Sequence, residues 1–97
     1  MTRLTAGELE TFLTEHPGWR TSGDAIVKEF SFRGFRGSIA FVNRTADLAN
    51  AAGHHPDLEI HYDRVLVSLS THDEGGVTDK DVALATEIDA AAEPAES

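Results

Sequence analysis

The chain has 97 residues and a formal net charge of −9, from 8 basic and 17 acidic residues, which fits one small acidic domain. We therefore expect no direct binding to nucleic acid or to an anionic membrane, because such binders present a basic face. The chain contains no cysteine, which excludes disulfides, thiolate metal sites and cysteine nucleophiles. It also lacks an apolar run of the ~20 residues that span a bilayer and an apolar signal-peptide core at its start, so we expect a cytoplasmic protein.

The first third of the chain predicts one helix followed by a hairpin. Thr5 and Glu8 have the spacing of a capping box at a helix N-terminus. An apolar stripe follows, and Pro17–Gly18 ends the helix. Residues 19–22 and 25–32 then predict two strands, because a glycine-aspartate pair of the hairpin type separates them.

The middle of the chain predicts a long helix and a second pair of strands. Apolar residues recur at helical spacing from Phe35 to Ala52, and Gly53 stands where helices commonly end. Alternating patterns from Leu58 to Tyr62 and from Val65 to Ser70 predict two strands. We place the turn between them at Asp63–Arg64.

A last helix begins after Thr78, a plausible N-cap, and its buried stripe extends to Ala92. The order is therefore helix, strand, strand, helix, strand, strand, helix. Strands joined by short turns pair antiparallel. The predicted fold is α+β, a two-layer sandwich in which helices cover one face of a four-stranded antiparallel sheet. We expect a single domain over residues 1–92 and a frayed C-terminal tail over residues 93–97.

Three of the five histidines, His54, His55 and His72, fall within nineteen residues. Imidazole exchanges protons near neutral pH. Pro56 favours extended backbone at His55, so the two adjacent rings should point in opposite directions. His72 lies by parity on the same side of its strand as Ser70, away from the apolar face. We interpret the group as a site for proton transfer.

Each histidine also has a structural interpretation. The pair could mark a helix-to-strand junction with one ring near the helix C-terminal dipole, and His72 could be a solvent-facing strand end. The three imidazoles could also supply ligands to a metal ion. Adjacent rings diverge, however, and no i, i+4 helical pair of the zinc-protease kind is present, so we expect no metal. His16 and His61 are expected at the surface.

The run Gly53–Pro56, followed after five residues by Tyr62, after nine more by His72 and after eight more by Asp81, resembles the signature of the pterin-4a-carbinolamine dehydratases. The strand end of that family, Leu-Ser-Thr-His, is present as Leu69–His72. The resemblance covers roughly Leu4 to Ala90. It departs from the family at three positions: Leu58 replaces a frequent aromatic, Asn50 a frequent glutamate, and Lys80 the arginine of animal members. We expect these changes to affect affinity or substrate preference first.

The resemblance implies dehydration of 4a-hydroxytetrahydropterin to quinonoid dihydropterin, without metal or organic cofactor, since the pterin is the substrate. His54 and His72 would be the acid–base pair, and His55 would orient the substrate and assist. Asp81 would bond the pterin or fix an imidazole tautomer, and its structural alternative is a charge at a helix N-terminus. The substrate-binding residues implied are Pro56, Tyr62, Ser70, Thr71 and Asp81.

The resemblance also implies partners. Self-association as a homodimer or homotetramer is expected, and so is an aromatic amino-acid hydroxylase that acts in the same pathway. The alternative function is a non-catalytic module that binds, oligomerises or assists assembly. A metal-dependent hydrolase is a third and less favoured interpretation.

Overall fold

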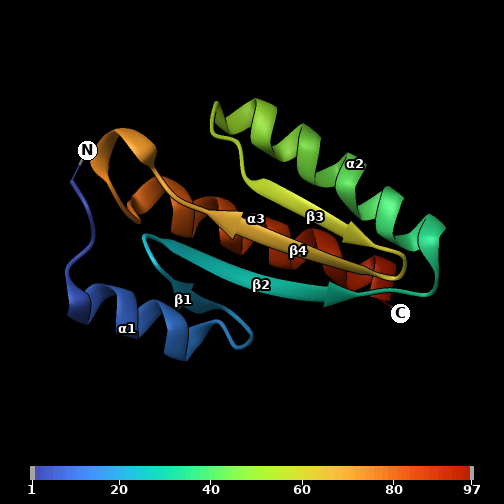
Figure 1. The fold of residues 1–97 in the computed structure, drawn as a ribbon, viewed down its shortest axis with the longest axis horizontal. Helices are drawn as coiled ribbons and strands as arrows, with labels where there is room; N and C mark the ends of the chain where they lie inside the picture. Colours follow the sequence, from blue (N-terminus) through green and yellow to red (C-terminus); the bar gives the residue numbers. More distant parts are fainter. Residues whose placement is uncertain (1, 97) are drawn as a thin grey trace.

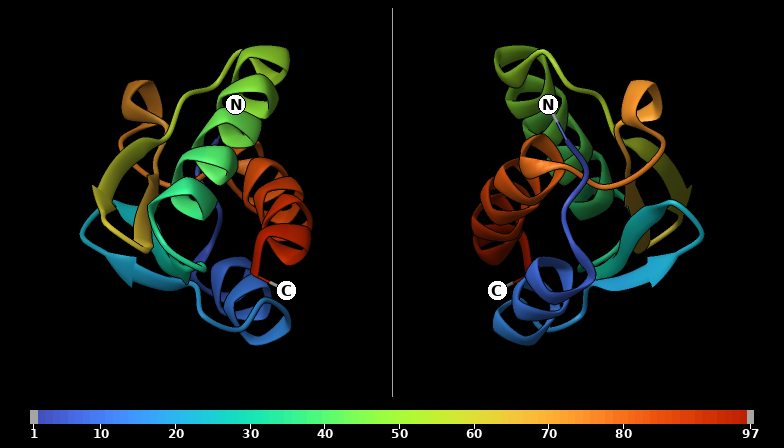
Figure 2. Two further views of the ribbon diagram at one scale, coloured as in Figure 1. Left: turned by 90° about the vertical axis from the view of Figure 1, so that its right-hand side faces the viewer. Right: turned by 90° about the vertical axis from the view of Figure 1, so that its left-hand side faces the viewer.

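The computed structural model describes residues 2–96 and has the predicted α+β architecture (Figure 1). A four-stranded antiparallel sheet has the order β1-β2-β4-β3. The helices lie on one side of this sheet, so the molecule has two layers (Figure 2). The elements are α1 (Ala6–Glu15), β1 (Arg20–Ser22), β2 (Ala25–Ser31), α2 (Phe35–Ala52), β3 (Asp57–His61), β4 (Arg64–Leu69), the 3₁₀ turn η1 (His72–Glu74) and α3 (Asp79–Glu96).

The two central strands provide the sheet's share of the core. Val65, Val67 and Leu69 on β4 are fully buried against the helices. Their register places Leu69 opposite Ile26 and Val65 opposite Phe30 on β2, so apolar side chains meet across the pair on one face. Residues of opposite parity on the same strands point to the uncovered face. This alternation fixes which residues of β4 face the helices and which face solvent.

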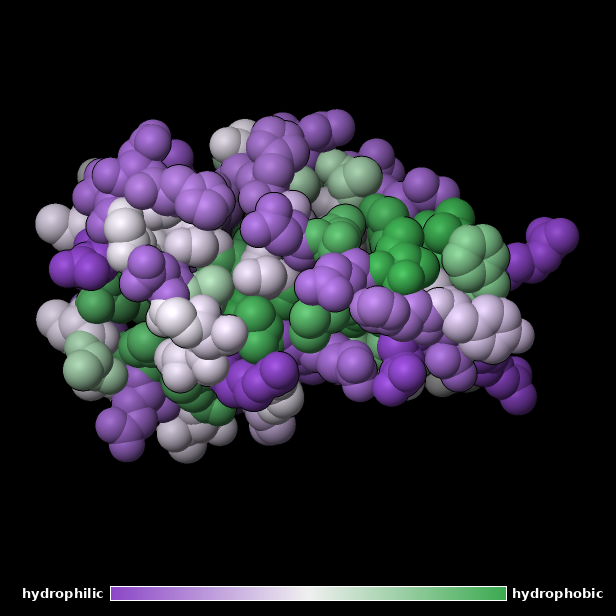
Figure 3. Space-filling view, in the orientation of Figure 1, coloured by the Kyte–Doolittle hydropathy of each residue, from purple (hydrophilic) through white to green (hydrophobic). Residues whose placement is uncertain are grey.

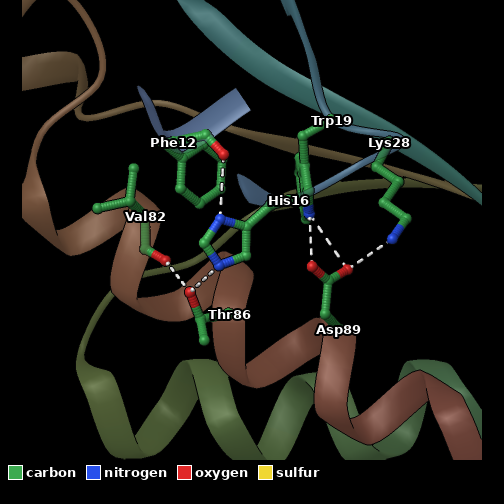
Figure 4. A network of polar contacts seen from close by, with 7 residues as sticks. All are labelled: Phe12, His16, Trp19, Lys28, Val82, Thr86 and Asp89. Carbon is green, nitrogen blue, oxygen red and sulfur yellow. Dashed lines mark hydrogen bonds and ion pairs between the residues drawn. The ribbon is translucent and has the colours of Figure 1, made fainter. Parts of the chain in front are cut away.

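Side-chain hydrogen bonds connect the end of α1, the residue before β1 and β2 to α3 (Figure 4). The buried Trp19 donates its Nε1–H to the Asp89 carboxylate at 3.0 and 3.1 Å, and Lys28 Nζ lies 2.8 Å from the same carboxylate. His16, which we expected at the surface, is half-buried. Its ring stacks on Phe12 and its Nδ1 lies 3.0 Å from the Phe12 carbonyl oxygen. The capping box of Thr5 and Glu8 at the start of α1 is confirmed.

β1 and β2 are each one residue shorter than predicted, at Trp19 and at Phe32, and three other boundaries differ from the sequence-based prediction. The second hairpin turns at Tyr62 and Asp63, because His61 pairs with Arg64 and leaves a two-residue loop. β4 ends at Leu69, the residue that pairs with Ile26 near the start of β2, so the chain is free to leave the sheet there. α3 continues to Glu96, because the alanines near residue 92 favour helix propagation. The backbone is therefore helical up to residue 96, Ser97 lies outside the described residues, and the frayed tail over residues 93–97 stays a prediction.

None of the helices within residues 2–96 is long and apolar enough to cross a membrane.

Asp89 should be important for stability because it satisfies a buried indole N–H. Asp89→Ala would leave Trp19 Nε1 without an acceptor, which costs about 1–3 kcal/mol of unfolding free energy. Asp47→Ala, which removes an exposed carboxylate from α2, should change it by less than about 0.5 kcal/mol. Urea denaturation followed by circular dichroism measures both. Equal stability of the two variants would show that the indole bond contributes nothing.

Candidate functional site

The candidate site lies where α2, β3, β4 and α3 have neighbouring ends, at the left of Figure 1. A cavity of about 320 Å³ opens there. All three predicted histidines line it, together with two predicted substrate-binding residues and three others. The lining residues are Gly53, His54, His55, Ser70, Thr71, His72, Asp73 and Lys80.

His54 is held at the end of α2 by its backbone and by its ring. Gly53 adopts the left-handed conformation that ends the helix, with φ 63° and ψ 30°. The His54 backbone N–H then donates to the Ala49 carbonyl at 3.1 Å. Its ring Nε2 bonds Oδ1 of Asp81, and 12% of the side chain is exposed. The imidazole is therefore fixed at Nε2, and the residue contributes to the lining of the cavity.

Asp81 is fully buried at the start of α3 and does not line the cavity. Its Oδ2 accepts hydrogen bonds from the Thr78 backbone N–H at 2.9 Å and from the Thr71 hydroxyl at 2.8 Å. Thr78 in turn accepts from the Lys80 backbone N–H at 3.3 Å, which makes a reciprocal cap of the capping-box kind. Asp81 therefore caps α3 and anchors His54. Both roles are alternatives to the predicted direct contact with a pterin.

This arrangement selects one tautomer of His54. Oδ2 of Asp81 accepts two hydrogen bonds, and a carboxylate can only accept, so the proton between Oδ1 and His54 belongs on Nε2. A neutral imidazole that donates from Nε2 keeps a lone pair on Nδ1. His54 lines the cavity, and Nδ1 is the ring nitrogen that this tautomer leaves able to accept a proton.

The other two histidines are less constrained. His55 is exposed, and its Nε2 lies 3.2 Å from Oδ1 of Asn50, one helical turn earlier. His72 is exposed and begins η1 instead of ending a strand. It still shares the cavity lining with Ser70, the residue of its predicted polar side. The cavity thus combines one anchored imidazole with two that are accessible to solvent.

Three predicted substrate-binding residues lie outside the lining: the buried Asp81, Pro56 and Tyr62. Pro56 is half-buried and lies between His55 and the start of β3. Tyr62 is 68% exposed at the far end of the sheet, about 16 Å from Asp57 at roughly 3.3 Å per strand residue. Tyr62 therefore does not meet the histidines within one chain. It has φ 54°, as the two-residue turn requires.

The structure adds residues that the sequence did not assign to the site. Gly53, Asp73 and Lys80 line the cavity, and the bond from Thr71 to Asp81 connects the end of β4 to α3. The Thr78-x-x-Asp81 spacing was a usable signal for the cap, whereas nothing in the sequence pointed to Thr71 as its partner. Among the side chains that the structure describes, those of residues 2–92, no group of three or more acidic or histidine residues is arranged to hold a metal ion.

Removing the Asp81 carboxylate should destabilise the domain. Asp81→Ala would leave the buried Thr78 N–H without an acceptor and the cap of α3 incomplete. We expect a loss of about 2 kcal/mol or more of unfolding free energy. Asp79→Ala removes an exposed charge from the same helical turn and should cost less than about 1 kcal/mol. Thermal denaturation of both variants measures the difference, and equal losses would mean that only helix-dipole charge matters at this position.

Comparison with known proteins confirms the family resemblance. The family model described as pterin 4 alpha carbinolamine dehydratase matches residues 2–91. A Thermosynechococcus vestitus protein is 52% identical over 86 residues, which cover 89% of this chain and 90% of that protein. A Thermomicrobium roseum protein is 48% identical over 88 residues, covering 91% and 95%. Both are named as pterin-4-alpha-carbinolamine dehydratases, and both names mark the assignment as provisional.

Solved structures show the same fold. The crystal structure of a transcriptional coactivator/pterin dehydratase from Brucella melitensis matches with a TM-score of 0.90 and 35% identity, over 94% of this chain and 99% of that one. A pterin dehydratase-like protein identified as a RuBisCO assembly factor in the alpha-carboxysome matches with a TM-score of 0.67 and 25% identity, over 79% and 92%. The chain belongs to the pterin 4 alpha carbinolamine dehydratase family.

Proposed function

We propose that the protein dehydrates 4a-hydroxytetrahydropterin to quinonoid dihydropterin by histidine acid–base catalysis. The observation that carries this proposal is that an anchored His54 and an exposed His72 line one cavity. Its volume of about 320 Å³ is at the lower end of the range for small-ligand sites, about 300–1,000 Å³. The residues that line it need no metal or organic cofactor for this chemistry.

The reaction requires two proton transfers on one substrate. A base removes the proton from a ring N–H while a C=N bond forms at C4a. An acid protonates the 4a-hydroxyl, the C4a–O bond breaks, and water leaves. His54 suits the role of base, because it lines the cavity and keeps a lone pair on Nδ1 while Asp81 holds Nε2–H. His72 is exposed and suits the acid that protonates the leaving hydroxyl. His55, positioned by Asn50, would orient the pterin.

The departures from the family signature have different structural consequences. Asn50 contacts the ring of His55. Where many family members have a charged glutamate, this chain therefore has a neutral hydrogen-bond partner beside the cavity. Lys80 lines the cavity directly. Leu58 is partly buried against the core and does not line it. We therefore assign a role in substrate preference to Asn50 and Lys80 before Leu58. An aromatic amino-acid hydroxylase as pathway partner and a cytoplasmic location stay predictions.

The acid–base roles are tested by paired substitutions. His72→Ala should lower turnover of a synthetic 4a-carbinolamine by about 10²-fold or more. Because His72 is exposed, the unfolding free energy of the His72→Ala protein should differ from that of the wild type by less than about 0.5 kcal/mol. His54→Ala would also remove a partner of buried Asp81, so here we expect lower stability in addition to lower turnover.

His54→Gln is the matched control for His54→Ala, because its amide can still donate to Asp81 but cannot exchange protons near neutral pH. We expect it to recover stability and not turnover. Stopped-flow absorbance follows the reaction, and denaturation gives the stability. Wild-type turnover in the folded fraction of His72→Ala or His54→Gln would remove that residue from the mechanism.

A second proposal concerns assembly and uses the far end of the sheet. Phe35, Ile60 and Tyr62 are 51%, 40% and 68% exposed. Figure 3 shows hydrophobic surface gathered where the β3–β4 hairpin meets the start of α2. β3 is also an edge strand, so its outer backbone groups can pair with another strand. We propose that a second copy of the chain covers this region, which would also suit a non-catalytic binding or assembly module.

Light scattering at micromolar concentration should therefore give the mass of a homodimer or homotetramer. Ile60→Lys places a charge on the β3 edge and should lower this mass toward that of the monomer. Thr21→Lys makes the corresponding change on β1, the opposite edge, and should leave the assembly intact. A monomeric wild-type protein, or equal effects of the two variants, would contradict assembly through β3.

A further inference from the structure

A second cavity adjoins the histidine cavity on the uncovered side of the sheet. Its volume is about 230 Å³. Ser70 and His72 line both cavities, so they stand at the junction between the two. The other residues that line the second cavity are Asp24, Ala25, Asp57, Ser68 and Gly75. A ligand whose ring occupied the histidine cavity could extend a substituent past Ser70 and His72 into this space.

Two acidic residues from different hairpins line this second cavity. Asp57 begins β3 and pairs with Ser68 of β4, so both side chains lie on the uncovered face of the sheet. Asp24 lies in the β1–β2 turn, where its carbonyl oxygen accepts a hydrogen bond of 2.8 Å from the Ser70 hydroxyl. This bond attaches the β1–β2 turn to the junction between the cavities.

The lining is acidic and rich in hydroxyl groups. None of the described residues that line the second cavity is lysine or arginine. Within residues 2–96, the ion pairs found do not include Asp24 or Asp57. In the histidine cavity, by contrast, Lys80 is accompanied by Asp73, so opposite charges are present there. The residues that line the second cavity therefore carry net negative charge. Arg3 is a cation beside it: its Nη1 lies 3.5 Å from the Gly75 carbonyl oxygen, and it lines a neighbouring cavity together with Asp24.

We propose that Asp24 and Asp57 are specificity-determining residues that select the substituent at C6 of the pterin; this inference rests on the proposed function. The pterin ring occupies the histidine cavity, and its C6 substituent reaches the second cavity. Carboxylates accept hydrogen bonds from hydroxyl groups, so a neutral hydroxylated substituent is favoured. A substituent that carries a carboxylate, such as one conjugated to glutamate, is repelled by the two like charges.

Binding of two stable pterins of similar size tests this selection without requiring turnover. 6-Hydroxymethylpterin carries a neutral hydroxyl group and 6-carboxypterin carries a carboxylate at the same position. At low ionic strength the wild-type protein should bind the neutral pterin about five- to tenfold more tightly, as measured by pterin fluorescence. In 1 M salt this difference should shrink, because the Debye length falls to about 3 Å.

The double variant Asp24→Asn/Asp57→Asn keeps side-chain size and should bring the two affinities within about twofold of each other. Asp47→Asn/Asp63→Asn changes net charge equally at positions outside both cavities and should keep the wild-type preference. Equal wild-type affinities, no detectable binding of either pterin, or a preference that survives in Asp24→Asn/Asp57→Asn would overturn the inference. A preference that behaves as expected in a protein without carbinolamine turnover would support the inference and refute the proposed catalysis.

Discussion

The buried carboxylate of Asp81 connects the elements on which the site depends. It joins the start of α3, through the Thr78 N–H, to the end of β4, through the Thr71 hydroxyl, and to the end of α2, through His54. Burying a carboxylate destabilises the folded state unless hydrogen bonds replace the water that the group loses. The three bonds therefore have to form together, and the ring of His54 takes its orientation from the same interaction that starts α3.

Patterns local in sequence were sufficient for most of the fold. The helical spacing of apolar residues and Gly53 predicted both ends of α2. An amphipathic helix and its left-handed end both depend on residues that are close together in the sequence. The hairpin turn was misplaced by one residue. The position of the turn depends on which residues pair across the strands. A tyrosine side chain does not favour a positive φ, so the sequence did not predict that Tyr62 begins the turn.

The site was predictable in composition and less so in geometry. Spacing identified the three histidines that line the cavity. It could not show that Thr71 and Asp81, ten residues apart, meet across the gap between sheet and helix, because that contact depends on packing. Nor could it show that β4 leaves the sheet after Leu69 and places His72 in η1. Tyr62 matches the family spacing and lies at the opposite end of β3, so a sequence motif does not by itself define one cavity.

The attachment of α1 has a consequence for local unfolding. Before α1, the Leu4 backbone N–H donates a hydrogen bond to the Val77 carbonyl oxygen. After α1, His16 and Trp19 bond α3 through their side chains. Segments held in this way can open as sub-global units, below the free energy of complete unfolding. We therefore expect backbone amides of α1 to exchange with solvent deuterium before those of β2 and β4. The histidine cavity, whose lining begins at Gly53, would keep its architecture during such openings.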